Sequence, residues 1–118
     1  AQGLLDLGVL RGDKDSVHDE GSHRGFFPHQ TSHWLGLDVH DPGDYRRDGS
    51  GRVLEPGMVF TIEPGLYFRS GHCGNKADRW AGIGVRIEDD VVVTEKGVEV
   101  LTGVLPTSVD EVEEAIGR

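Results

Sequence analysis

The segment from His29 to Asp41 contains three of the six histidines of this 118-residue chain, and an aspartate follows the third. The histidines are His29, His33 and His40, and most residues around them are apolar or aromatic. A neutral imidazole is the commonest side-chain metal ligand and the usual acid–base group near pH 7. The pattern therefore predicts that this segment forms one wall of a metal site.

Two acidic residues, Glu63 and Glu88, are the other candidate ligands, and each lies on an extended segment with alternating apolar residues. Buried carboxylates are costly unless they are paired or bound to a metal. Two carboxylates and one imidazole suit Mn, Zn, Co or Fe rather than a thiolate site. We therefore predict His33, Glu63 and Glu88 as ligands. Acidic residues at strand ends are also common without a metal, so the spacing alone leaves both interpretations open.

Three further polar residues have a structural alternative to a role in catalysis. His29 and His40 each suit a histidine that is satisfied by a hydrogen bond to a neighbour such as Asp38 or Asp41. Arg86 suits an ion pair with Glu88, which lies two residues away on the same face of one strand.

A strand from His33 onwards would place Leu35, Leu37 and Val39 on the face of His33 and would place His40 on the other face. Bringing His33 and His40 to one site therefore requires a bend. Gly36 is the position where a bulge or bend is expected.

Residues 55–65 predict a strand between two turns, because a Pro-Gly pair lies at each end and suits a type II turn. Val59, Thr61 and Glu63 share one face of this strand. Pro64 favours extended backbone at Glu63, so the carboxylate is held at the end of the strand.

Residues 82–90 alternate again, with one face predicted to point into the core (Ile83, Val85, Ile87) and the other to carry Gly84, Arg86 and Glu88. Residues 91–94 and 98–101 predict two strands of a hairpin. Residues 106–117 predict a helix that starts with a capping box between Ser108 and Glu111. Its buried stripe is predicted to be Val109, Val112 and Ile116.

The resulting layout is a helix end within residues 1–12, a polar segment at 13–25, several antiparallel strands and a terminal helix. This order predicts an α+β fold in one domain or a piece of one. The chain begins without a methionine and with a pattern typical of the interior of a helix, which favours an origin in a longer polypeptide.

Composition excludes several classes of partner. The formal net charge of −9 argues against binding to nucleic acid, which requires basic patches. A membrane span is not expected, because the sequence lacks a run of about 18 apolar residues. Cys73 is the only cysteine, so no internal disulfide is possible and a cytoplasmic location is expected.

Three stretches resemble Xaa-Pro aminopeptidase (aminopeptidase P) in the right order: Thr31–Asp41 (TSHWLGLDVHD), Leu54–Tyr67 (LEPGMVFTIEPGLY) and Gly82–Asp90 (GIGVRIEDD). That enzyme belongs to the pita-bread metallopeptidases, with prolidase, methionine aminopeptidase and creatinase. The resemblance runs over nearly the whole chain. It implies the C-terminal half of a pita-bread fold and the removal of an N-terminal residue ahead of proline from a peptide substrate.

The resemblance also implies a ligand set and roles for individual residues. The family holds two metal ions, often manganese, with two Asp, one His and two Glu. His33 matches the histidine ligand, and Glu63 and Glu88 match the glutamates, the second of which bridges both metals. His29 and His40 match histidines that hold the substrate and the tetrahedral intermediate, while Arg86 matches an arginine that supports the bridging glutamate and the substrate side.

One departure from the family concerns the two aspartate ligands, which come from a hairpin upstream of the matching segment. The aspartates that precede His29 here lie in helix or loop contexts: Asp6, Asp13, Asp15 and Asp19. Residues 1–118 therefore resemble the C-terminal portion of the catalytic domain, without its upstream half and the N-terminal domain. The two Asp ligands are missing from this chain.

Two hypotheses follow. In the first, the chain is a fragment of an aminopeptidase P, or part of a split enzyme that a second polypeptide completes, and it has little activity alone. In the second, the chain is a non-catalytic pita-bread-like module that binds a partner or peptide. Apolar strand faces left uncovered would favour homo-oligomers in either case.

Overall fold

The computed structural model describes residues 1–71 and 78–117, so Cys73 lies outside the described residues. The chain divides into two compact units, one comprising Ala1–His29 with Pro64–Arg86 and the other Gln30–Glu63 with Ile87–Arg118. Each unit joins segments that are distant in sequence. None of the helices within the described ranges combines the length and the apolarity that crossing a membrane requires.

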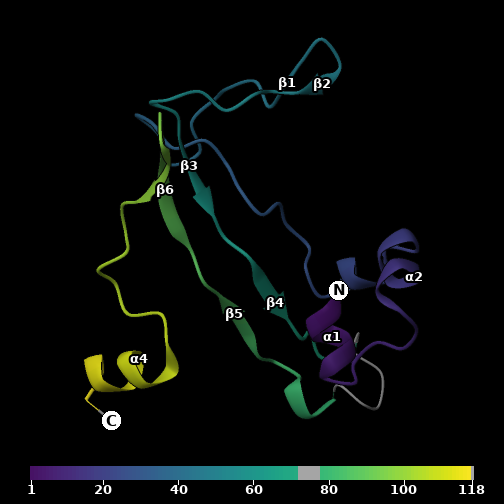
Figure 1. Cartoon of the computed structure of the whole chain (residues 1–118). Helices are drawn as coiled ribbons and strands as arrows, with labels where there is room; N and C mark the ends of the chain where they lie inside the picture. The colour runs from purple at the N-terminus through teal and green to yellow at the C-terminus, as the bar shows by residue number, and fades with distance from the viewer. Residues whose placement is uncertain (72–77, 118) are drawn as a thin grey trace. The chain divides into compact units, whose positions relative to one another are not determined.

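The first unit contains the N-terminal helices and one strand pair (Figure 1). Its elements are α1 (Gln2–Asp6), α2 (Lys14–Asp19), η1 (Ser22–Gly25), β4 (Gly65–Tyr67), η2 (Asp78–Trp80) and β5 (Gly84–Arg86). Its core is made of Leu4, Phe26 and Phe68, with Leu66 and Trp80 packed against them. The Asp13 side chain caps the N-terminus of α2 by accepting hydrogen bonds from the amides of Asp15 and Ser16.

Strands β4 and β5 pair in an antiparallel register with Gly65 opposite Arg86 and Tyr67 opposite Gly84. The predicted second type II turn, at Pro64-Gly65, is therefore wrong. Gly65 begins a strand and does not have the positive φ that this turn requires of its glycine. The first turn is confirmed, because Gly57 has a φ of 92° and the Met58 amide donates to the Glu55 carbonyl.

The second unit contains an antiparallel three-stranded sheet in the order β3-β6-β7. Its elements are β1 (Arg46–Arg47), β2 (Ser50–Gly51), β3 (Val59–Ile62), β6 (Asp89–Thr94), β7 (Gly97–Val100) and α4 (Val109–Ala115). The predicted hairpin is confirmed, since β6 and β7 pair up to Thr94 and Gly97. Strand β3 lies beside β6 (Figure 1), with Thr61 opposite Asp90.

The segment that carries His33 runs antiparallel to β3 and then leaves it. The Leu35 amide donates to the Val59 carbonyl, and Trp34 bridges to Phe60. The chain turns after Leu35, so the bend that was expected at Gly36 is present and no regular strand continues to Val39. Val39 is exposed, as is Leu37.

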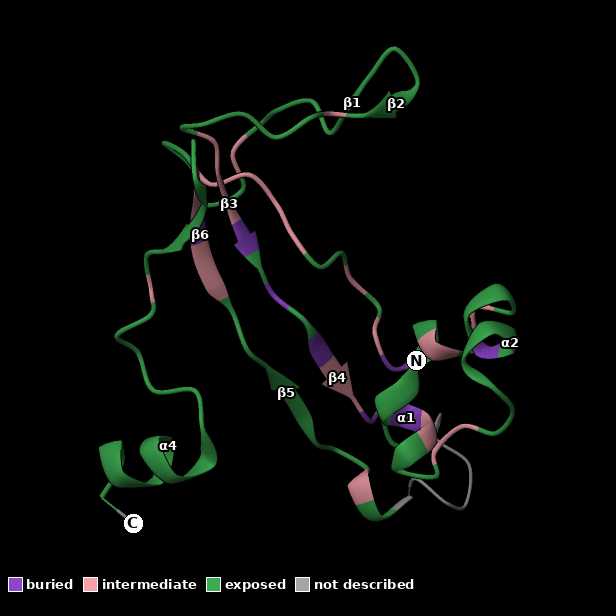
Figure 2. Ribbon diagram, viewed as in Figure 1, coloured by how far each residue is buried: buried purple, intermediate pink, exposed green. Residues whose placement is uncertain are grey.

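The apolar face predicted for residues 83–87 is exposed, and β5 is coloured accordingly (Figure 2). Ile83, Val85 and Ile87 are 46%, 57% and 45% exposed, so the prediction that they face a core is wrong. Alternation identifies the apolar face of a strand, but it does not supply a surface that covers this face. The antiparallel sheets and the terminal helix nevertheless confirm the α+β class.

The C-terminal helix α4 has the predicted start but not the predicted burial. Ser108 and Glu111 form the capping box in both directions. The helix is coloured as exposed along its length (Figure 2), and the predicted buried stripe is 72%, 39% and 61% exposed at Val109, Val112 and Ile116. The capping box therefore forms as the local sequence predicts, although the apolar stripe of the helix is not covered by another part of the described chain.

The capping box generates a prediction about ionisation. Hydrogen bonds from the Ser108 hydroxyl and amide lower the pKa of Glu111 below its ordinary value of 4.5. A carboxylate with a lowered pKa stabilises the helix above its unfolded pKa, and the contribution is lost as pH falls through the folded pKa. Ser108→Ala should raise the pKa of Glu111 towards 4.5 in an NMR titration of its carboxyl carbon.

Thr107→Ala is the matched control, because only the Thr107 backbone interacts with Glu111. It should leave the pKa of Glu111 lowered. An unchanged pKa in Ser108→Ala would show that the serine hydroxyl does not hold this carboxylate.

Candidate metal centre

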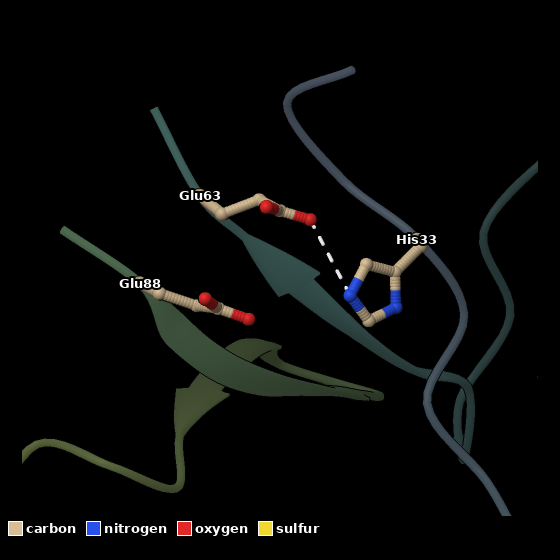
Figure 3. A group of neighbouring side chains, drawn as sticks. All are labelled: His33, Glu63 and Glu88. Carbon is tan, nitrogen blue, oxygen red and sulfur yellow. Dashed lines mark ion pairs between the residues drawn. The ribbon is translucent and has the colours of Figure 1, made fainter. Parts of the chain in front are cut away.

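The second unit brings together one imidazole and two carboxylates from three separate segments. One ligand atom from each of His33, Glu63 and Glu88 lies within 4.8 Å of the other two. Figure 3 shows the three side chains pointing towards one another, with Glu63 and Glu88 on neighbouring strand segments. Glu63 is buried, His33 is half-buried and Glu88 is exposed. The residues predicted as ligands are thus neighbours in space, and the cluster is accessible to solvent at Glu88.

Strand register explains why the two glutamates meet. Thr61 lies opposite Asp90 in the β3–β6 pair. Glu63 and Glu88 are each two residues further along, so both side chains return to the face of Thr61. Glu63 and Glu88 therefore lie opposite each other on the two neighbouring chain segments, on the face that alternation had assigned to Thr61 and Glu63.

Backbone hydrogen bonds fix His33 beside β3. The Thr61 amide donates to the His33 carbonyl at 2.9 Å, and the Glu63 amide donates to the Thr31 carbonyl at 2.8 Å. His33 Nε2 consequently lies 3.3 Å from Glu63 Oε1.

The Thr61 hydroxyl connects two of the ligand candidates, His33 and Glu63, a role that the sequence analysis missed. Thr61 is 1% exposed. Its oxygen accepts a hydrogen bond from the His33 amide at 3.1 Å and donates one to Glu63 Oε1 at 3.2 Å. The available signal was its place two residues before Glu63 on the same strand face.

A bend places His40 against His33, as the sequence required. The chain leaves β3 after Leu35, and the His40 ring centroid returns to 4.4 Å from that of His33, with an angle of 70° between the rings. His40 itself is exposed. Its ring is therefore positioned to contact whatever approaches the His33 side of the cluster.

The donor set fits a divalent transition metal. Carboxylate oxygens and one imidazole nitrogen are ligands that Mn and Zn accept, and no thiolate is among them. Glu63 is the strongest sign of such a role, because its carboxylate is buried at 6% exposure among polar partners. An open position beside the exposed Glu88 is what a catalytic rather than a purely structural site retains.

The first unit contains a second polar group, built around Tyr67. The Tyr67 hydroxyl is 3.0 Å from His29 Nε2 and accepts a hydrogen bond from Arg86 Nε at 2.8 Å. The three side chains line a cavity of about 370 Å³ together with Pro28 and Ile83. His29 is thus hydrogen-bonded to a tyrosine, and the sequence analysis assigned no role to Tyr67.

Two glycines leave room for the Tyr67 ring. A Cβ atom on Gly65 would lie 2.8 Å from the Tyr67 hydroxyl, and one on Gly84 would lie 2.8 Å from Tyr67 Cδ1. Gly65 shares the strand face of Tyr67, and Gly84 is its cross-strand partner. The ring therefore lies across both glycines and delivers its hydroxyl to His29 and Arg86.

Comparison with known proteins identifies the class to which these sites belong. Residues 8–95 match metallopeptidase family M24, and the chain belongs to that family. The match includes all six residues to which the sequence assigned a metal or catalytic role: His29, His33, His40, Glu63, Arg86 and Glu88.

Several similar proteins are Xaa-Pro aminopeptidases. The chain is 51% identical over 111 residues to the Xaa-Pro aminopeptidase of Escherichia coli, which covers 94% of the chain and 24% of that enzyme. It is 40% identical over 117 residues to Xaa-Pro aminopeptidase 3 of Rattus norvegicus, covering 99% of the chain and 22% of the relative. The chain thus spans about a quarter of the length of these relatives.

Solved structures show the same fold. An aminopeptidase of Pseudomonas aeruginosa superposes with a TM-score of 0.91 at 50% identity over 98% of this chain and 26% of that chain. Aminopeptidase P of E. coli with the inhibitor Pro-Leu gives a TM-score of 0.88 at 48% identity, with the same coverage. The architecture therefore matches part of the aminopeptidase P pita-bread domain, as the resemblance implied.

The Thr61 hydroxyl should be needed for both stability and metal binding. Thr61→Val keeps the shape but removes the partner of the His33 amide, which should cost about 1–3 kcal/mol of unfolding free energy in urea titrations. Metal affinity by calorimetry should fall about tenfold or more, because the ligands lose an orienting contact.

Thr61→Ser keeps the hydroxyl and should retain most of the metal affinity. Equal affinities for Thr61→Val and the unaltered chain would show that this hydroxyl does not orient the ligands.

The Tyr67 hydroxyl should couple His29 to Arg86. Tyr67→Phe keeps the ring over the two glycines but removes both hydrogen bonds, and should lower the unfolding free energy by about 1–2 kcal/mol. The imidazole signals of His29 should shift in heteronuclear NMR spectra. Tyr45→Phe, in the other unit, should leave those signals in place, and unchanged His29 signals in Tyr67→Phe would contradict the coupling.

Proposed function

We propose that this chain provides the His/Glu/Glu part of the metal centre of an Xaa-Pro aminopeptidase. His33, Glu63 and Glu88 would hold divalent metal, with a pair of Mn ions as the first choice and Zn or Co as alternatives. The observation that carries this proposal is the convergence of three ligand atoms within 4.8 Å from segments distant in sequence. Membership in a metallopeptidase family supports it.

The substrate proposed for the complete enzyme is a peptide with proline at the second position. This choice is supported by the E. coli Xaa-Pro aminopeptidase, which is 51% identical to the chain, and by the structure of aminopeptidase P with the inhibitor Pro-Leu. The reaction would be hydrolysis of the bond that precedes proline, releasing the N-terminal residue.

The chain's own residues would divide the work. When bound, paired metal ions would polarise the scissile carbonyl and lower the pKa of a water molecule. Glu63 and His33 are held for ligation by Thr61. In this proposal His40 contacts the substrate side of His33, and His29 and Arg86 bind the peptide through the Tyr67-centred group.

A non-catalytic binding module is the second candidate. The family resemblance implies five ligands including two aspartates, whereas the described residues contain one ligand cluster, with three members. A chain with three ligands holds metal more weakly and would leave the Tyr67-lined cavity as a peptide-binding surface. We expect little or no peptidase activity from this chain alone for the same reason.

The remaining assignments follow from this proposal. Residues 1–118 would correspond to the C-terminal portion of the catalytic domain, and the chain's partners would be a peptide substrate and a complementing polypeptide or a second copy. The apolar residues exposed on β5 and β7 favour such contacts. We also propose a cytoplasmic location, because a single cysteine gives no indication of an oxidising compartment.

A chimaera tests the proposed function directly. The chain should replace the matching segment of the E. coli Xaa-Pro aminopeptidase and preserve cleavage of an Xaa-Pro dipeptide. Glu63→Gln in the chimaera should lower kcat/KM by at least about a thousandfold, because a metal ligand is lost and a buried carboxylate no longer balances the cation. Glu55→Gln, an exposed carboxylate on the approach to β3, should leave activity unchanged.

An inactive but folded and metal-loaded chimaera would favour the binding module. Robust cleavage by the purified 118-residue chain would instead refute the expectation that it is inactive alone.

A further inference from the structure

Residues 34–41 form a loop that is closed by a hydrogen bond from the Asp41 amide to the Trp34 carbonyl. We propose that Asp41 is a positioning residue that sets the orientation of His33 and holds His40 against it. The proposal rests on the proposed metal centre for its functional meaning, but its geometry is independent of whether metal binds.

The loop closes on a carboxylate seated where Gly36 has no side chain. A Cβ atom at Gly36 would lie 2.4 Å from Asp41 Oδ2 and 2.6 Å from its Cγ. Asp41 Oδ1 accepts a hydrogen bond from the Asp38 amide at 3.3 Å, and the Gly36 amide donates to the Asp38 carbonyl at 3.2 Å. The Asp41 carboxylate therefore links the end of the loop to Asp38 in its middle and occupies the space beside Gly36.

The Trp34 carbonyl transmits this closure to the ligand candidate. It accepts a hydrogen bond from the Asp41 amide at 3.1 Å, and His33 Nδ1 lies 3.0 Å from the same oxygen. A carbonyl has two lone pairs and can only accept, so the second bond requires the proton of the imidazole to be on Nδ1. Closing the loop therefore fixes the carbonyl that orients the His33 ring.

The consequence for His33 lies on its other nitrogen. With Nδ1 bonded to Trp34, Nε2 points at Glu63, 3.3 Å away, which is the direction of the ligand cluster. Metal-binding histidines commonly donate their second ring N–H to a backbone carbonyl, which fixes both the tautomer and the ring plane. Asp41 supplies the constraint that keeps this carbonyl in place.

The consequence for His40 is positional. His40 directly precedes Asp41, so anchoring the Asp41 backbone and carboxylate returns the His40 ring to 4.4 Å from the His33 ring. Asp41 thus positions His40 through the backbone that joins the two residues, and not through a hydrogen bond to the His40 imidazole.

Gly36→Ala is the sharpest test because it displaces only the far end of the Asp41 side chain. Gly36 does not have a positive φ, so the backbone accepts alanine. The matched control is Gly51→Ala, a strand glycine without a positive φ and with open space around its Cβ position. Asp41→Ala removes the carboxylate that seats the loop but keeps the main-chain amide, and Asp41→Asn keeps the side-chain shape and an acceptor oxygen.

The measurement is NMR of the metal-free 118-residue chain labelled with ¹⁵N-histidine. In the unaltered chain we expect a nuclear Overhauser effect between the His33 and His40 rings and the neutral His33 proton on Nδ1. Gly36→Ala and Asp41→Ala should lose both signals while the β3 and β6 amides keep their shifts. Asp41→Asn and Gly51→Ala should retain both.

Zinc titration of the same samples provides the functional readout. Zinc affinity should fall about tenfold in Gly36→Ala, as is usual when the group that orients a ligand is disturbed. The proposal is overturned if Gly36→Ala and Asp41→Ala keep the ring contact and the Nδ1 proton, or if Asp41→Asn is as disruptive as Asp41→Ala. A chain that binds no zinc but shows the expected NMR changes would refute the metal centre and leave the positioning role of Asp41 intact.

Discussion

The burial of the Glu63 carboxylate is the constraint on which the second unit depends. A carboxylate at 6% exposure is costly unless polar groups compensate for the lost hydration. The Thr61 hydroxyl contributes to that compensation by donating a hydrogen bond to Glu63 Oε1. The same hydroxyl accepts a hydrogen bond from the His33 amide, and the backbone of residues 31–35 pairs with β3. The group that satisfies the Glu63 carboxylate therefore also holds the segment that carries the histidines.

The same strand segment uses its opposite face for packing. His33 points to the acidic cluster, whereas Trp34 lies opposite Phe60 and stacks on Tyr45, with ring centroids 6.0 Å and 5.6 Å apart. Aromatic pairs of this geometry contribute about 0.5–1.5 kcal/mol beyond the area they bury. This aromatic packing explains how a segment with one β-bridge to β3 can hold a ligand candidate firmly.

Sequence alone predicted the ligand cluster better than it predicted the packing around it. Alternation in strands determines which residues share a face, and this was sufficient to group Glu63 with Thr61 and to require a bend before His40. Alternation does not reveal which other surface covers an apolar face, so Val85 and Ile116 were wrongly expected to be buried. The roles of Thr61 and Tyr67 depend on hydrogen bonds across strands, and a single sequence carries no direct sign of them.

Glycines explain why these hydrogen-bond networks fit into so small a structure. The Asp41 carboxylate lies where Gly36 has no Cβ, the Tyr67 ring lies across Gly65 and Gly84, and a Cβ on Gly43 would lie 2.8 Å from Trp34 Cδ1. None of these four glycines has a positive φ. They are therefore required for space rather than for backbone conformation. In this chain, the absence of a Cβ atom at these glycines leaves the space that the side chains of Asp41, Tyr67 and Trp34 occupy next to the backbone.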